Sequence, residues 1–194
     1  MLEKAELVSC WRRLPRLCLS IRPREGRLPT ERILINGVMT ETLRERLVPG
    51  MCAIFVGLNP SPVSVQAGHY YQGQLGRRFW DRVHEYGMIP WDRVGAEDDF
   101  AIKLCFGFAD LVRRPTPCDN GLTRAEKVRG ATDLIARLQR LPDRPPIIFV
   151  FKDAWDFAGL GLEKAGFRIL RFPGPYAARD LVARQMTELV AALG

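Results

Sequence analysis

The sequence lacks the hydrophobic stretch that a membrane-spanning helix requires. Such a helix needs about 18 or more consecutive apolar residues, and no apolar run in the chain of 194 residues approaches that length. The N-terminus also lacks the pattern of a secretory signal, because Arg12, Arg13, Pro15 and Arg16 interrupt its apolar residues. We therefore expect a cytoplasmic protein that makes no contact with a membrane.

Three signatures of common α/β enzymes are missing as well. There is no Gly-x-x-x-x-Gly-Lys-Ser/Thr phosphate loop and no Gly-x-Gly-x-x-Gly dinucleotide fingerprint. There is also no Gly-x-Ser-x-Gly nucleophile elbow. A generic nucleotide-binding domain or hydrolase is therefore the weakest of the alternative interpretations.

The cysteines form no recognisable disulfide framework or metal site. Their number is odd, no C-x-x-C pair occurs, and their positions are Cys10, Cys18, Cys52, Cys105 and Cys118. Cys52 and Cys105 lie in apolar runs, where a thiol behaves as a small core residue. This spacing predicts neither a disulfide scaffold nor a metal or iron–sulfur centre. We expect no cofactor and no metal.

Positive charge is in excess and unevenly distributed. The formal net charge is +7, and residues 1–38 hold eight Lys and Arg residues but four Asp and Glu residues. We assign residues 1–38 to a flexible basic N-terminal extension and residues 39–194 to the folded domain. An alternative is that the natural chain starts at Met39, because Thr40 resembles the N-cap of a short helix that would end at Leu47.

The order of apolar segments predicts an α/β fold. The expected strands are Cys52–Val56, Ile102–Phe108, Ile147–Phe151 and Phe167–Phe172. The expected later helices are Thr123–Leu141, with a capping box at its start, Asp153–Ala165 and Ala178–Leu193. Strands that alternate with helices are typical of a parallel sheet covered on both faces.

The stretch from Met51 to Gly87 is the most informative part of the chain. A buried strand breaks into Gly57-Leu58-Asn59-Pro60, and a loop with a histidine and two tyrosines leads to the amphipathic segment Phe79–Tyr86. A strand that ends in a tight turn and feeds a helix is where open α/β sheets bind ligands. We therefore expect the active site here.

Four short motifs occur in an order typical of one family. They are Gly57–Pro60, Gly68-His69-Tyr70-Tyr71, Arg78-Phe79-Trp80, and Gly107–Thr116. The series resembles the mismatch-specific uracil/thymine-DNA glycosylases of the uracil-DNA glycosylase superfamily, over about residues 45–190. The resemblance implies a three-layer α/β sandwich with a small four-stranded parallel sheet flanked by helices. It also implies an enzyme that flips a base out of double-stranded DNA and hydrolyses its N-glycosidic bond.

The resemblance also implies roles for individual residues. Asn59 would position the water that attacks the sugar, and because an amide is a poor proton acceptor, turnover should be slow. Tyr71 would stack on the flipped base, with Leu58 and His69 beside it. His69 could equally be an ordinary loop histidine, and Phe79 and Trp80 are expected in the core.

The chain departs from the family pattern at two places. Asp110 stands where relatives have asparagine or another residue, and it is either a general base for the water or a cap of the following turn. The last loop contains Tyr176, a candidate wedge between bases, and Arg179, a candidate contact to a phosphate or to the orphaned base. The alternative for this loop is a proline-rich turn with Arg179 in solvent.

Together these features predict a monomeric, monofunctional DNA glycosylase that removes uracil and other deaminated or mismatched bases. Arg77, Arg78 and Lys152 are expected to contact DNA phosphates. Two alternatives stay open: a preference for hypoxanthine or xanthine, and a non-catalytic DNA-binding relative. The presence of Asn59 argues against the second.

Overall fold

The computed structural model describes residues 29–89, 94–117 and 121–194. At its centre, four parallel strands pair in the order β4-β3-β5-β6. The strands are β3 (Ala53–Gly57), β4 (Phe106–Asp110), β5 (Ile147–Phe149) and β6 (Ile169–Arg171). The predicted α/β class with a small four-stranded parallel sheet is confirmed.

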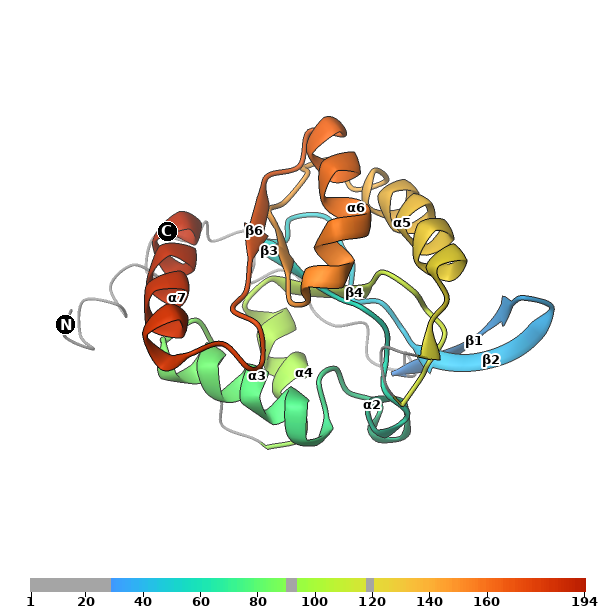
Figure 1. Cartoon of the computed structure of the whole chain (residues 1–194), viewed down its shortest axis with the longest axis horizontal. Coiled ribbons are helices and arrows are strands. Elements are labelled where there is room, and N and C mark those ends of the chain that lie inside the picture. The colour runs from blue at the N-terminus through green and yellow to red at the C-terminus, as the bar shows by residue number, and fades with distance from the viewer. Residues whose placement is uncertain (1–28, 90–93, 118–120) are drawn as a thin grey trace.

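Helices cover both faces of this sheet, which gives three layers (Figure 1). One face carries α5 (Arg124–Leu138) and α6 (Lys152–Lys164), and the other carries α3 (Gly73–Glu85), α4 (Glu97–Lys103) and α7 (Arg179–Leu193). The central strand β3 is buried throughout, and its side chains alternate between the two layers. Phe55 packs with α3 and α7, whereas Ile54 and Val56 pack with α5 and α6.

Local signals explain where the helices begin and end. Thr123 and Glu126 form the predicted capping box of α5, each satisfying a backbone N–H of the other. The helix ends at Leu138, before the expected Leu141. Gly166 follows α6 with φ of 86°, a left-handed conformation that stops the helix.

The region around Met39 differs from the prediction. The expected helix from Thr40 to Leu47 is wrong, because β1 (Thr30–Ile35) and β2 (Val38–Leu43) form an antiparallel hairpin there. Asn36 and Gly37 both have positive φ, 50° and 81°, as a two-residue Asn-Gly turn requires. The expected boundary at residues 38 and 39 therefore falls inside the hairpin. The remainder of the predicted extension, residues 1–28, lies outside the described residues.

The predicted strand Ile102–Phe108 is also corrected. Its first residues complete α4, and β4 begins only at Phe106. Cys105 turns the chain between them with φ of 67°. It is fully buried, as expected, but it is disulfide-bonded, which the sequence did not predict. Two further helices, α4 and α2 (Pro62–Ala67), were not predicted.

No helix in the described ranges is both long enough and apolar enough to span a lipid bilayer.

Candidate functional site

A cavity of about 120 Å³ lies at the carboxyl ends of the sheet strands. The chain passes from β3 to β4 on one side of β3 and then crosses over to β5 on its other side. A point where the strand order reverses in this way is where α/β sheets bind ligands. Every strand of the sheet contributes to the lining at or just beyond its end. The contributing residues are Asn59 and Pro60 after β3, Asp110 in β4, Val150 and Phe151 after β5, and Phe172 and Pro173 after β6.

Asn59 is fixed by its side-chain amide nitrogen. That nitrogen donates to the backbone oxygens of Pro60 at 3.2 Å and Arg114 at 3.1 Å, and to Thr116 Oγ1 at 2.8 Å. Because carbonyl oxygens only accept, these contacts determine which side of the amide is nitrogen. The Oδ1 atom accepts no hydrogen bond from any described residue, so the amide presents an acceptor in the cavity lining.

Asp110 is the last residue of β4 and pairs in register with Gly57, the last residue of β3. It therefore lies next to the turn that carries Asn59. Its side chain is 4% exposed and lines the cavity. Within the described ranges, its carboxyl group makes no hydrogen bond, so the alternative role as a cap of the following turn has no contact to support it. Burial raises the pKa of Asp110 from 3.8 to about 8, with a further contribution from the negative charge of Glu45.

A network of ion pairs lies behind Asp110. Arg137 pairs with Glu45 at 3.0 Å and donates to the backbone oxygen of Asp110 at 2.9 Å. Arg113 pairs with Glu31 of the hairpin and lowers the pKa of Asp110, as Arg137 does. Burial outweighs both cations, so Asp110 is neutral in most molecules at pH 7.

Tyr71 forms an aromatic wall of the same cavity. Its ring lies 4.2 Å from the ring of Phe79, centroid to centroid, and both line the cavity. Its hydroxyl is buried without a hydrogen-bond partner among the described residues. A side-chain carbon at Gly57 would meet both this hydroxyl and the carboxyl of Asp110, so only glycine fits beneath them. Burial, then the charge of Asp110, raises the pKa of Tyr71 well above 10.

Two residues expected to contact the base lie elsewhere. The side chain of Leu58 is buried in the core between the sheet and α5 and α6, away from the cavity lining. His69 is also absent from the lining, and its ring hydrogen-bonds to Asp98 of α4 instead. Phe79 and Trp80 belong to the core, as predicted, although Phe79 also borders the cavity.

One arginine that sequence reasoning missed holds the last loop. Arg82 of α3 lines the cavity, and its guanidinium donates to the backbone oxygens of Pro173 at 2.9 Å, Gly174 at 2.7 Å and Pro175 at 3.3 Å. Arg78, one helical turn earlier, lies 5.5 Å from the ring centroid of Tyr176. The two arginines therefore tie the loop to α3.

Replacing Arg82 by leucine should lower the free energy of unfolding by about 1–3 kcal/mol, because the carbonyl groups of Pro173 and Gly174 lose their charged donor. The Pro175 carbonyl keeps only its 3.4 Å hydrogen bond from Arg78. Urea denaturation measures the change. Arg77→Leu is the matched control, since Arg77 is exposed on the same helix and makes no described contact to the loop. Equal losses of unfolding free energy in the two variants would contradict the role of Arg82 in holding the loop.

The other expected DNA contacts are exposed. Tyr176 is 79% exposed, and Arg179 is the first residue of α7, three positions further on. Lys152 begins α6, directly after the cavity-lining Phe151, but it forms an ion pair with Asp156 at 2.5 Å. Arg77 makes no ion pair with a described residue.

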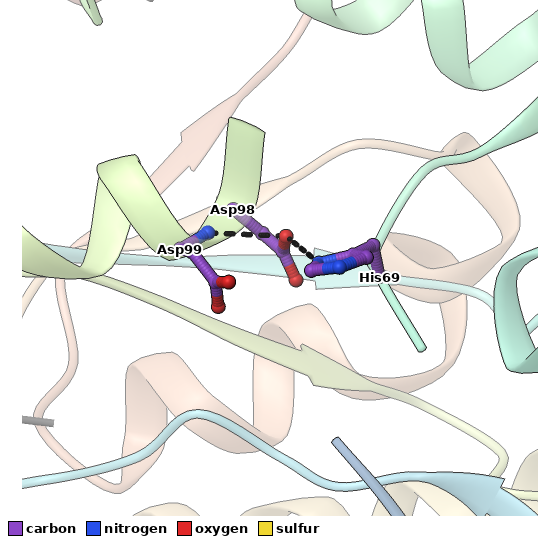
Figure 2. A group of neighbouring side chains, drawn as sticks. All are labelled: His69, Asp98 and Asp99. Carbon is purple, nitrogen blue, oxygen red and sulfur yellow. Dashed lines mark hydrogen bonds and ion pairs between the residues drawn. The ribbon is translucent and has the colours of Figure 1, made fainter. Parts of the chain in front are cut away.

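One group of side chains resembles a metal site in composition. His69, Asp98 and Asp99 bring their ligand-type atoms within 4.8 Å of one another. Figure 2 shows that the Asp98 carboxylate is already an acceptor, from His69 Nδ1 at 2.7 Å and from the backbone nitrogen of Asp99 at 3.1 Å. We therefore interpret the group as a hydrogen-bonded His–Asp pair.

A comparison with known protein families finds no family model that matches this chain.

Proposed function

We propose that the protein is a monofunctional DNA glycosylase that removes uracil, and other deaminated or mismatched bases, from double-stranded DNA. The observation that carries the proposal is the orientation of Asn59. Its nitrogen is bound to the scaffold, and its oxygen is left as an acceptor in a cavity with an aromatic wall. The resemblance of the four motifs to the glycosylase family supplies the reaction class.

The proposed reaction is a hydrolysis at the anomeric carbon of the sugar. The water oxygen held by Asn59 bonds to that carbon, and the carbon–nitrogen bond to the base breaks with its electron pair leaving on the base. The water loses one proton to Asp110 when that carboxyl is ionised. With a pKa of about 8, Asp110 is ionised in about one molecule in ten at pH 7, which is a second reason to expect slow turnover.

The surroundings of the cavity support binding of a flipped base. Tyr71 lines the cavity and would supply the surface on which the base stacks, a contact worth about 1–3 kcal/mol per base. Tyr176 is exposed on the loop that borders the cavity and is available to enter the base stack. Arg77, Arg78, Lys152 and Arg179 would bind the phosphates of the duplex. No lysine lines the cavity among the described residues, so we propose no covalent lyase step.

The test is a base-release assay with excess protein and labelled duplexes. The duplexes carry uracil opposite guanine, uracil opposite adenine, thymine opposite guanine, hypoxanthine, or xanthine, and alkali cleaves any abasic site formed. We expect release of uracil and no complex trapped by borohydride. Release of hypoxanthine or xanthine alone would reassign the specificity. Duplex binding without release from any substrate would overturn the enzymatic proposal.

A further inference from the structure

The loop that carries Tyr71 is held in a strained conformation. Tyr71 has φ of 55°, in the left-handed region that residues other than glycine rarely adopt. Gly76 of α3 packs directly on the Tyr71 carbonyl, where any side-chain carbon would overlap it. Strain of this kind persists only where neighbouring contacts enforce it, and it is concentrated at functional sites. The contacts on either side of Tyr71 must therefore hold its backbone in this conformation.

Asp98 enforces the conformation from the α4 side. Its carboxylate is fully buried and accepts from the backbone nitrogen of Tyr70 at 3.1 Å and from His69 Nδ1 at 2.7 Å. Figure 2 shows the His69 ring and the Asp98 carboxylate directed toward each other from the loop and from α4. On the other side of Tyr71, the nitrogen of Gln72 donates to Ser64 Oγ at 3.0 Å.

We propose that His69 is a positioning residue that acts through Asp98 and the backbone of Tyr70 to hold the ring of Tyr71 in the cavity wall, and that protonation of His69 tightens this hold. The proposal rests on the proposed function in one respect, because it takes the Tyr71 ring as the surface that receives the base. The contact between His69, Asp98 and Tyr70 can be tested without that function.

The charges around His69 set the direction of the pH effect. The charged groups that act on His69 are Asp98 and Asp99 of α4 and Arg46. The guanidinium of Arg46 also pairs with Asp99, with Nη2 3.6 Å from Oδ1. The hydrogen bond to Asp98 is the main reason why the pKa of His69 is raised above 6.5. Below about pH 6.5 the bond is therefore charge-assisted, and this assistance is lost as the pH rises through the raised pKa. The neutral ring still donates from Nδ1, so the contact weakens without breaking.

Two substitutions separate the hydrogen bond from the charge. In His69→Asn the side-chain nitrogen is as many bonds from the backbone as Nδ1 is, so it can donate to Asp98 without titrating. His69→Ala has no donor. We expect the enzyme concentration that gives half-maximal single-turnover release of uracil to rise about three- to tenfold in the wild type from pH 6 to pH 8.5. His69→Asn should lose this rise and keep only a change that follows the ionisation of Asp110 near pH 8, whereas the concentration should be raised throughout in His69→Ala.

A second measurement does not depend on activity. In nuclear magnetic resonance spectra, the amide signals of Tyr70 and Tyr71 should titrate in the wild type with the midpoint of His69. This step should be absent from His69→Asn, in which the remaining change follows Asp110 near pH 8. The same titration in His69→Asn, or wild-type half-saturation in His69→Ala, would overturn the proposal. If the amides follow His69 but no duplex loses a base, the coupling stands and the glycosylase function falls.

Discussion

Replacing Asn59 by alanine should lower the single-turnover rate of uracil release about a hundred- to a thousandfold, with binding of the duplex much less affected. The reason is geometric: the oxygen of Asn59 is the acceptor that would hold the attacking water, and small errors in the position of a reacting group cost about a hundredfold. Rapid quench measurements with protein in excess report this rate directly.

Two matched variants test the role of the orientation itself. Thr116→Val removes the 2.8 Å anchor but leaves both carbonyl acceptors, so we expect a loss of about tenfold or less. Leu75→Ala changes another residue of the cavity lining, one that is 43% exposed, and should leave the rate near that of the wild type. Release at the wild-type rate by Asn59→Ala would refute the proposed mechanism.

Asp110→Asn should have the second large effect, a loss of about a hundredfold or more in rate. The wild-type rate should rise with pH up to about 8, as more Asp110 becomes ionised and able to accept the proton of the water. The amide at position 110 does not ionise, so the residual rate of the variant at saturating protein should lack this rise with pH. A pH–rate profile from about pH 5.5 to 9 measures both effects. Full activity in Asp110→Asn would exclude the general-base role.

The same substitution should stabilise the protein at alkaline pH. Because the pKa of Asp110 is raised from 3.8 to about 8 in the folded protein, the folded state binds a proton that the unfolded state releases between those values. The free energy of unfolding of the wild type therefore falls as pH rises through this window. The amide of the Asp110→Asn variant does not titrate, so the difference in melting temperature between variant and wild type should grow from about pH 5 to pH 8. Thermal unfolding at both values tests it.

The sequence was sufficient to predict elements whose signals are local. The apolar run that forms β3 is buried on both sides, and the capping box at Thr123 and Glu126 marks the start of α5. The hairpin escaped prediction because Thr40 resembles a helix start, although Asn36-Gly37 is a strong hairpin signal. The apolar run from Ile102 resembles one strand, although Cys105 divides a helix from a strand within it.

Only part of the site can be predicted from where its residues stand relative to the expected strands. Asn59 and Asp110 line the same cavity because the carboxyl ends of neighbouring parallel strands lie together, which the predicted sheet already requires. The contacts of His69 and Arg82 depend on segments 29 and 91 residues away, and no local pattern identifies those partners. The burial that raises the pKa of Asp110 likewise exists only in the folded chain.

The β1–β2 hairpin gives the choice of initiation codon a physical consequence. A product that began at Met39 would keep all four strands of the central sheet and every cavity-lining residue. It would lose β1, however, and with it the backbone partners of β2. An unpaired strand edge recruits another strand, so we expect the shorter product to self-associate, which light scattering beside the full-length chain would detect.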